Sequence, residues 1–577
     1  MRPKASDNSL SFSIPRLRIL YGLLLVVFVI FLVRLFYLQI IKHDYYKKVA
    51  IAGQFKEYKI PAERGVILAR DGENEVPIVL NEDVFTVFAD PKYIKDAKST
   101  ANKVQSIIGG EQSKYEDLMK QDTRYSVLAK KINKDDAKKI DDLKIKGLGS
   151  RAVSQRVYPQ GSVASQLLGF VDDEGNGKYG IEQFLDKQLR GAEGQLKAIT
   201  DAQGVPLVSN DDNILIEPKN GERTSLTIDI SMQKRAEDLL KAHLEEVKSK
   251  SGSLLIMDPN TGEIKAMANY PTYNPAEFSK VEDSKLFTNS TVSEPLEVGS
   301  IMKTLTVSAG LDSGAITSNT TYYDPSFFKI GDATVRNVEE DGGAQTRTIP
   351  DILRYSLNTG ATYILMQMGG GEINEKARLK WHDYMTNHFM LGTKTGIEQG
   401  YEADGFIPSP TDGFGLNIQY ANTAFGQGTN ITPIQMLSAF SATINGGTYY
   451  QPHLVVSKDK KIVKEKIINP DLSMVMRSMH ENSVAKNYTF LKRSGEYRVG
   501  GKTGTAEITK PGGGYYNDRY NGTFVGYIGG DKPEYAIMVV VNEPKVDGYA
   551  GRAAAAPLFG KTIDMLIGNY AVNRVTQ

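Results

Sequence analysis

The chain has 577 residues, too many for one hydrophobic core, so we expect two or three domains. Its formal net charge of +1 gives no electrostatic reason to bind nucleic acid. It contains no cysteine, which excludes disulfides and thiolate metal sites.

A long apolar segment near the N-terminus predicts a transmembrane helix over residues 19–41. Ile19–Val33 is uncharged, and the run continues through Leu35–Ile41 with only Arg34 and Gln39 interrupting it. This is roughly the ~20 residues needed to span a bilayer. Arg34 falls near one end, where its side chain can reach the interface.

Basic residues before this helix predict its orientation. They are Arg2, Lys4, Arg16 and Arg18, against Asp7 alone. The positive-inside rule therefore keeps residues 1–18 as a tail in the cytoplasm and puts the rest outside. A cleaved signal peptide is the alternative, but Ala50-Ile51-Ala52 lies too far from the apolar run. We expect an uncleaved, single-pass anchor in the lipid bilayer of the cytoplasmic membrane.

Residues 43–220 predict an N-terminal domain outside the membrane. They mix short strands with lysine-rich helices such as Lys92–Ile108 and Asp135–Ile145. The charges on these helices are interpreted as solvated faces.

The pattern changes at about residue 225, and residues 225–577 predict a second domain of the α+β class. A strand at Leu226–Asp229 precedes an amphipathic helix at Ser231–Lys248. The remaining predicted elements are strands at Ser253–Met257, Ile264–Asn269, Gly522–Ile528 and Tyr535–Val541, and a helix near Phe559–Asn569. Together they predict an antiparallel sheet with helices on both sides.

Ser300 and Lys303 form a candidate nucleophile and base. Residues three apart share one face of a helix, about 5–6 Å apart at Cβ, so the lysine amine can reach the serine hydroxyl. Ser-x-x-Lys also occurs at Ser326/Lys329, Ser457/Lys460 and Ser483/Lys486, which are interpreted as surface pairs. Only Ser300 follows a glycine and opens a long apolar stretch, Ile301–Ala309, typical of a buried helix. Burial favours the neutral, basic amine.

Two further motifs complete the candidate site. Ser356 and Asn358 form a Ser-x-Asn triplet, and Lys502-Thr503-Gly504-Thr505 contains Lys-Thr-Gly. Ser356 can relay a proton, Asn358 can orient the lysine or the substrate, and Lys502 can attract a substrate carboxylate. Thr503 and Thr505 offer hydroxyls, Gly504 leaves room for a ligand, and the backbone N–H groups of Ser300 and Thr505 can form an oxyanion hole.

A second Lys-Thr-Gly occurs at Lys394-Thr395-Gly396. It follows a polar, helix-like segment and leads into a Gly/Pro/Asp-rich stretch, so it predicts a loop. The Lys502 copy is followed by the two strong strand candidates given above. A glycine-flanked edge strand is what a substrate-binding strand requires, so Lys502 is selected.

The chain resembles the class B penicillin-binding proteins, which are peptidoglycan D,D-transpeptidases. The three motifs Ser-x-x-Lys, Ser-x-Asn and Lys-Thr-Gly are typical of that family. Further signatures are Arg64-Gly65-Val66-Ile67, Arg70-Asp71-Gly72, Arg156-Val157-Tyr158-Pro159, Gly180-Ile181-Glu182 and Gly191-Ala192-Glu193-Gly194, together with Ala424–Gly428 and Asn542-Glu543-Pro544. The signatures between Arg64 and Gly194 belong to the pedestal region of the family, and their polar residues are expected to be structural. Gly299–Lys303 and Thr523–Tyr527 favour the septal, cell-division branch over the elongation branch.

The resemblance implies the following chemistry and partners. Ser300 attacks the penultimate D-Ala of a D-Ala-D-Ala stem peptide, and an amine of a neighbouring strand accepts the acyl group. β-Lactams acylate the same serine. No metal or cofactor is implied, and the six histidines show no metal-ligand spacing. A membrane-embedded glycan polymerase and divisome proteins are expected as partners.

Three other functions remain open at this stage. A hydrolase, either a carboxypeptidase or a β-lactamase, needs a base that activates water, and no glutamate after Asn358 lies in a recognisable motif for that step. A β-lactam receptor would be expected to carry a signalling segment, and the 18-residue tail leaves little room for one. A scaffold with vestigial motifs fits least, because all three motifs are chemically intact.

Overall fold

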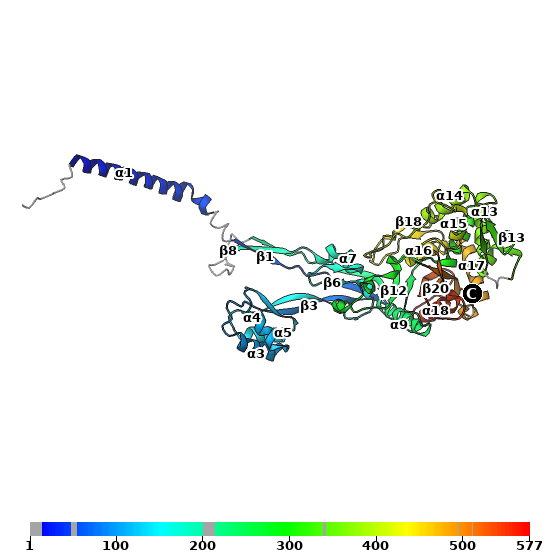
Figure 1. The fold of residues 1–577 in the computed structure, drawn as a ribbon, viewed down its shortest axis with the longest axis horizontal. Coiled ribbons are helices and arrows are strands. Elements are labelled where there is room, and N and C mark those ends of the chain that lie inside the picture. The colour runs from blue at the N-terminus through cyan, green and yellow to red at the C-terminus, as the bar shows by residue number, and fades with distance from the viewer. Residues whose placement is uncertain are drawn as a thin grey trace, which may run out of the picture. The chain divides into compact units, whose positions relative to one another are not determined.

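A computed structural model of the chain describes residues 14–47, 55–199, 214–337, 342–493, 495–510 and 512–576. Most of the predicted tail, residues 1–13, lies outside the described residues, as does Ala50-Ile51-Ala52. The contacts divide the chain into two compact units, residues 1–62 with 191–220 and residues 63–190 with 221–577. The elements of both units are labelled in Figure 1.

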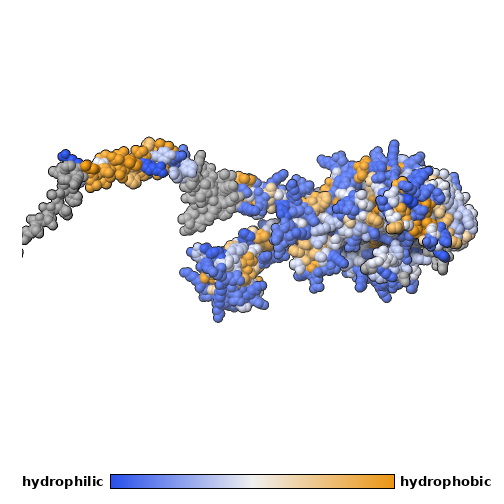
Figure 2. Space-filling model, turned by 45° about the horizontal axis from the view of Figure 1, so that its top comes forward, coloured by the Kyte–Doolittle hydropathy of each residue, from blue (hydrophilic) through white to orange (hydrophobic). Residues whose placement is uncertain are grey.

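The first unit contains the apolar helix and a small sheet. Helix α1 (Ile14–Phe36) continues into the π-turn η1 (Tyr37–Ile41), and the stretch Leu17–Ile41 is long and apolar enough to cross a membrane, with none of its window buried in protein. Its surface is mostly apolar, with hydrophilic atoms toward its two ends (Figure 2). Strands β1 (Phe55–Ile60), β8 (Gly194–Ile199) and β9 (Ile214–Ile216) form an antiparallel sheet in that order.

The second unit begins with a five-stranded sheet that carries three helices. Its strands are β10 (Thr224–Asp229), β2 (Ile67–Asp71), β3 (Asn74–Ala89), β4 (Ser126–Ile132) and β5 (Leu148–Val157), and β3 pairs with both β4 and β5. The helices are α3 (Ala97–Ile108), α4 (Gln112–Met119) and α5 (Lys134–Asp142). They enclose a small core with Val87, Val104 and Ile140 at its centre. The predicted helix over Lys92–Ile108 begins later, at Ala97, because the Asp96 side chain accepts the Ser99 N–H and caps the helix there.

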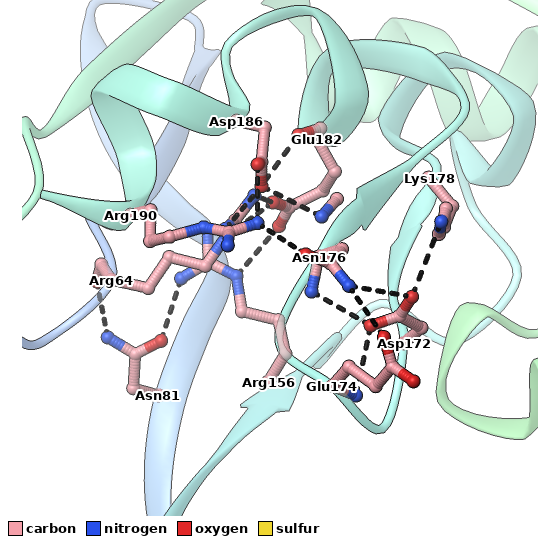
Figure 3. A network of polar contacts seen from close by, with 11 residues as sticks. Arg64, Asn81, Arg156, Asp172, Glu174, Asn176, Lys178, Glu182, Asp186 and Arg190 are labelled. Carbon is pink, nitrogen blue, oxygen red and sulfur yellow. Dashed lines mark hydrogen bonds and ion pairs between the residues drawn. The ribbon is translucent and has the colours of Figure 1, made fainter. Parts of the chain in front are cut away.

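Short elements follow, and they hold the most buried charges of this region. They are α6 (Ser165–Leu168), β6 (Phe170–Val171), β7 (Gly177–Lys178), α7 (Gly180–Phe184) and α8 (Asp186–Arg190). Glu182 has no solvent exposure and accepts Arg64 Nε at 2.8 Å and Arg156 Nε at 2.7 Å (Figure 3). Asn81 joins the two arginines, since its side chain accepts Arg156 Nη1 and donates to the Arg64 carbonyl. The expectation that these signature residues are structural agrees with this geometry.

The rest of the second unit is built on an antiparallel sheet. In order, its strands are β12 (Ile264–Tyr270), β11 (Ser251–Met257), β21 (Pro533–Asn542), β20 (Tyr515–Gly529) and β19 (Arg498–Thr509). Alternate residues of one strand enter different cores: Leu254 and Ile256 lie in one, and Leu255 and Met257 in the other. This alternation is expected of a strand covered on both faces. The strand order places β19 at one edge of the sheet.

Helices cover both faces of this sheet, which confirms the predicted α+β class. Helices α9 (Ile230–Glu246) and α18 (Ala556–Asn569), which follows the π-turn η8 (Gly551–Ala555), supply one core. The other side holds α11 (Met302–Asp312), α12 (Ile349–Arg354), α13 (Asn358–Gly369), α14 (Glu375–Asp383) with η6 (Tyr384–His388), α15 (Leu416–Thr423), α16 (Pro433–Ile444) and α17 (Leu472–Asn487). Every residue of α16 is buried, so this helix forms the centre of that layer.

The connections between these helices contain short hairpins and turns. The hairpins pair β13 (Thr321–Asp324) with β16 (Gln345–Thr348), β14 (Phe327–Ile330) with β15 (Ala333–Arg336), and β17 (Tyr449–Tyr450) with β18 (Ile462–Lys464). Short helical segments are η2 (Pro275–Lys280), η3 (Ser284–Phe287), α10 (Ser290–Ser293), η4 (Gly299–Ile301) and η7 (Thr489–Leu491). The turn η4 contains Ser300.

The buried charge cluster around Glu182 provides a stability test. Glu182→Ala would leave two largely buried guanidinium groups without their shared carboxylate, which typically costs about 3–5 kcal/mol. Arg190→Ala removes a partly exposed ion pair with Asp186, which is worth about 0–1 kcal/mol, and a surface hydrogen bond to Asn176. We expect chemical denaturation to show a large loss of stability for Glu182→Ala and a small one for Arg190→Ala. Equal losses would contradict a structural role for the Glu182 cluster.

Candidate active site

The segment carrying Ser300 is fixed by two close backbone approaches. Gly299 has a φ of 61°, and a Cβ there would lie 2.7 Å from the Thr505 carbonyl oxygen, so only glycine fits. The Gly299 N–H donates to the Gly426 carbonyl at 3.2 Å. Ser300 therefore lies in a 3₁₀ turn held between strand β19 and the Gly426 segment, directly before helix α11.

Lys303 is fully buried, yet its amine contacts the other candidate groups. Its Nζ lies 2.9 Å from Ser300 Oγ, 2.7 Å from Asn358 Oδ1 and 2.5 Å from the Ser356 carbonyl oxygen. It also lies 3.2 Å from Ser356 Oγ. Burial, followed by the charge of Lys502, holds the pKa of Lys303 well below its usual range.

These partners suit a neutral amine. The Ser356 carbonyl can only accept, and Asn358 Oδ1 accepts, so they take the two N–H groups that a neutral amine has. The amine lone pair is then available to the Ser300 hydroxyl hydrogen. The geometry is therefore that of a base ready to take the proton of Ser300.

Ser356 occupies a backbone conformation that is uncommon for serine. Its φ is 59°, in the left-handed region, which costs roughly 1–2 kcal/mol for a residue other than glycine. Leu357, the middle residue of the triplet, is completely buried and precedes helix α13. The Asn358 side chain donates to the Arg336 carbonyl at 2.9 Å, which fixes its oxygen toward Lys303. The strained turn thus presents both Ser356 and Asn358 to the amine.

The edge strand β19 brings the third motif to the same place. Lys502 Nζ donates to Ser356 Oγ at 3.0 Å and to the Thr503 carbonyl at 2.8 Å. Burial lowers the pKa of Lys502 to about 7. Ser356 Oγ therefore lies between two lysine amines, and a proton can pass across it.

The two threonines on this strand are each held by a neighbour. Thr503 Oγ1 lies 2.9 Å from the Tyr488 hydroxyl, and Thr505 Oγ1 accepts the Gly551 N–H at 3.0 Å. Because Gly551 uses a lone pair of Thr505, the hydroxyl hydrogen remains free for a ligand. Gly504 differs from expectation: a Cβ there would lie 2.3 Å from Thr523 Oγ1, so protein atoms fill the space expected for a ligand.

The second Lys-Thr-Gly copy has a different structure. Lys394 is exposed on a loop. The N–H and hydroxyl of Thr395 donate to Glu402 Oε1, and the Gly396 N–H donates to Glu402 Oε2. The Glu402 carboxylate, a few residues further along, thus occupies the polar groups of this Lys-Thr-Gly copy. In the described part of the chain, none of the pairs Ser326/Lys329, Ser457/Lys460 and Ser483/Lys486 forms a hydrogen bond between its serine and its lysine, and Ser483 is buried rather than on the surface.

Sequence reasoning missed Glu297 and Tyr515. Glu297 Oε1 accepts the Tyr515 hydroxyl and the Gly428 N–H, each at 2.9 Å. No recognisable spacing marked Glu297 in the sequence, although it lies only three residues before Ser300. Within the described ranges, no group of three or more histidine, cysteine, aspartate or glutamate side chains is placed to hold a metal ion.

Comparison with known families agrees with this geometry. Residues 252–564 match the Penicillin binding protein transpeptidase domain, and residues 59–226 match the Penicillin-binding Protein dimerisation domain. The first match alone covers more than half of the chain.

Individual relatives extend the similarity to almost the whole chain. Stage V sporulation protein D of Bacillus subtilis is 30% identical over 94% of this chain and 84% of its own length. Peptidoglycan D,D-transpeptidase FtsI of Escherichia coli is 27% identical over 97% of this chain and 92% of its own. Penicillin binding protein 3 of Mycobacterium tuberculosis, solved with ampicillin, has a TM-score of 0.66 and 23% identity, over 90% of this chain and 98% of that chain. The chain therefore belongs to the class B penicillin-binding proteins, the serine-type D,D-transpeptidases.

Proposed function

We propose that this protein crosslinks peptidoglycan stem peptides through an acyl-enzyme on Ser300. The observation that supports this most directly is the buried Lys303 amine, 2.9 Å from Ser300 Oγ and held by Asn358 and Ser356. A buried lysine with no carboxylate partner is suited to act as a base. The name of the FtsI relative, a peptidoglycan D,D-transpeptidase, supports the same substrate class.

Acylation begins when Ser300 attacks the carbonyl carbon of the penultimate D-Ala. Lys303 takes the hydroxyl proton as the Oγ–C bond forms, and the backbone N–H groups of Ser300 and Thr505 stabilise the oxyanion. One such donor is typically worth about 3–4 kcal/mol in the transition state. Breakdown of the tetrahedral intermediate breaks the C–N bond, and the proton passes from Lys303 across Ser356 Oγ to the leaving D-Ala amine.

Lys502 would bind the terminal carboxylate of the donor peptide. It must be positively charged to do so, whereas Lys303 must be neutral. Their mutual repulsion helps to keep one of the two amines unprotonated. The hydroxyls of Thr503 and Thr505 add donors to the same carboxylate.

Covalent β-lactam binding follows from the same chemistry. A β-lactam carbonyl would acylate Ser300, and the ring opens without releasing a separate leaving group. The ampicillin complex of the related Mycobacterium protein supports this proposal. A β-lactam receptor or a hydrolase would share the acylation step, so the fate of the acyl-enzyme distinguishes them.

The septal branch is the proposed cellular role, and the elongation branch is the alternative. The preference for the septal branch rests on Gly299–Lys303 and Thr523–Tyr527 in the sequence. The proposed setting is the cytoplasmic membrane, with the N-terminus inside, the catalytic domain outside, and a glycan polymerase and divisome proteins beside it. A fluorescent fusion in dividing cells tests the branch: a band at the division site supports septal synthesis, and signal along the side wall supports elongation.

The nucleophile is tested by Ser300→Ala. We expect loss of covalent labelling by a fluorescent penicillin, because the variant has no hydroxyl to acylate, with an unchanged thermal unfolding midpoint. Peptide mapping of the labelled wild type should find the modification on Ser300. Persistent labelling on Ser326, Ser457 or Ser483 would refute the assignment.

Lys303 is tested by comparing Lys303→Arg with Lys303→Ala. Arginine keeps a charge but does not deprotonate in proteins, so both variants should lose acylation to a similar extent, by about 10²-fold or more. In wild type, acylation should rise with pH as Lys303 deprotonates, at a pH below the usual lysine range. It should fall again as Lys502, with its pKa of about 7, loses the charge that holds the carboxylate. An active arginine variant would show that another group takes the Ser300 proton.

The two Lys-Thr-Gly copies are tested against each other. Lys502→Ala should lower the second-order acylation rate constant by about tenfold or more, because a charge-assisted hydrogen bond to the substrate is lost. Lys394→Ala is the matched control, since this lysine is exposed on a loop, and should leave that rate constant unchanged. Comparable losses in proteins of equal thermal stability would overturn the choice of Lys502.

A further inference from the structure

Glu297 lies where three segments of the active site meet. Its own segment pairs with the Gly426–Ile431 stretch, since Leu296 and Ile431 exchange two backbone hydrogen bonds. Its Oε1 accepts the Gly428 N–H from that stretch and the Tyr515 hydroxyl from strand β20. Three residues of chain reach at most about 11 Å, so the Cα atoms of Glu297 and Ser300 lie within that distance of each other.

A second carboxylate lies close to Glu297. Glu507 is two residues beyond Thr505 on strand β19, and its Oε2 accepts Gln427 Nε2 at 2.8 Å. Gln427 adjoins Gly428, which binds Glu297. Among the described residues, no lysine or arginine forms an ion pair with either carboxylate. The titratable groups that face Glu297 are Tyr515 and Glu507.

One oxygen of Glu297 is left without a partner. Glu297 is only 7% exposed, and its Oε2 is buried with no hydrogen bond within the described structure. An unsatisfied buried acceptor is unfavourable, so a donor that reaches Oε2 gains a hydrogen bond there. Burial, and then the nearby Glu507, raise the pKa of Glu297 above its usual range.

Transfer of the acyl group to the acceptor amine, the second half of the reaction, needs a carboxylate that can bind and deprotonate that amine. An amine that attacks the acyl-enzyme arrives mainly as an ammonium ion near neutral pH, because alkyl amines have pKa values near that of lysine. It must be bound as a cation and then lose a proton. Lys303 and Lys502 cannot bind a cation, since they are amines themselves and repel positive charge.

We propose that Glu297, with Glu507 beside it, is the site that binds and deprotonates the acceptor amine of transpeptidation. This inference rests on the proposed function. Because Oε2 is buried, the acceptor ammonium reaches it by replacing the Tyr515 hydroxyl on Oε1, and it then donates to the carboxylate. The class of ligand is a primary ammonium at the end of a flexible side chain or peptide.

The step balances in protons and bonds. Glu297 takes one proton from the ammonium and becomes a neutral carboxylic acid, and the freed amine attacks the ester carbonyl of acyl-Ser300. The C–N bond forms, the C–Oγ bond breaks, and the second amine proton passes through Lys303 to Ser300 Oγ. Glu297 then releases its proton to solvent.

The test uses full-length protein in detergent and a thioester analogue of the D-alanyl donor, with D-alanine as the acceptor. The readout is the ratio of aminolysis to hydrolysis product, which is formed from one acyl-enzyme and does not depend on the acylation rate. Glu297→Gln keeps an oxygen for Gly428 and Tyr515 but removes the charge and the base. We expect it to lower the ratio by about tenfold or more. Glu294→Gln, an exposed carboxylate three residues away, is the matched control and should leave the ratio unchanged.

Two further measurements separate this role from a structural one. Hydroxylamine is uncharged at the assay pH, so its aminolysis should be much less sensitive to Glu297→Gln than that of D-alanine. In wild type the D-alanine ratio should rise with pH as Glu297 ionises, and again at higher pH as the acceptor amine itself deprotonates; only the first rise should be absent in the variant. If Glu297→Gln does not fold, Glu507→Gln should still lower the ratio about threefold, because it removes the second charge.

The outcomes distinguish this inference from the proposed function. A wild-type protein that forms no acyl-enzyme refutes the proposed function, and this inference with it. Acyl-enzyme that forms normally in Glu297→Gln, with an unchanged product ratio, refutes only the acceptor site. Equal losses for D-alanine and hydroxylamine would show that Glu297 merely supports the fold.

Discussion

The active site depends on one constraint: the Lys303 amine is completely buried and has no carboxylate partner among the described residues. A charged lysine in such a place would be costly, so the amine is held in its neutral, basic form. What surrounds it is consistent with that state: a backbone carbonyl, an amide oxygen and hydroxyls, all of which serve a neutral amine. A nearby carboxylate would stabilise the ammonium and remove the base.

Other parts of the fold supply the uncharged acceptors and the second amine around Lys303. The edge position of β19 brings Lys502, a second amine, against Ser356. The left-handed turn at Ser356 points both a carbonyl and a hydroxyl at Lys303. The completely buried Glu182, by contrast, lies in the Arg64–Arg156 cluster and is fully paired there. The buried carboxylate of Glu182 is thus paired with opposite charge, whereas the buried amine of Lys303 is kept neutral.

Much of this was predictable from the sequence, because the chemistry depends on residue type and spacing. The α+β class, the antiparallel sheet, the apolar helix and the meeting of Ser300, Lys303, Ser356, Asn358 and Lys502 all followed from motifs and periodicity. The features that the sequence did not predict depend on contacts between distant segments. The packing of Thr523 against Gly504 fills a space expected for a ligand, and no spacing rule reveals it. The sequence predicted that Lys394 lies on a loop. It did not predict the hydrogen bonds from Thr395 and Gly396 to Glu402, which form only when the loop is folded.

Glu297 illustrates the same limit and its consequence for mechanism. A glutamate three residues before a nucleophile has no recognisable spacing, and only the fold leaves one of its oxygens buried and unpartnered. Lys303 and Glu297 share no hydrogen-bond partner. Lys303 contacts Ser300, Ser356 and Asn358. Glu297 contacts Gly428 and Tyr515. Amines and carboxylates are therefore segregated around one serine. Segregation suits a reaction with two substrates of opposite charge, because a donor carboxylate and an acceptor ammonium can each find a complementary group without the two groups neutralising each other.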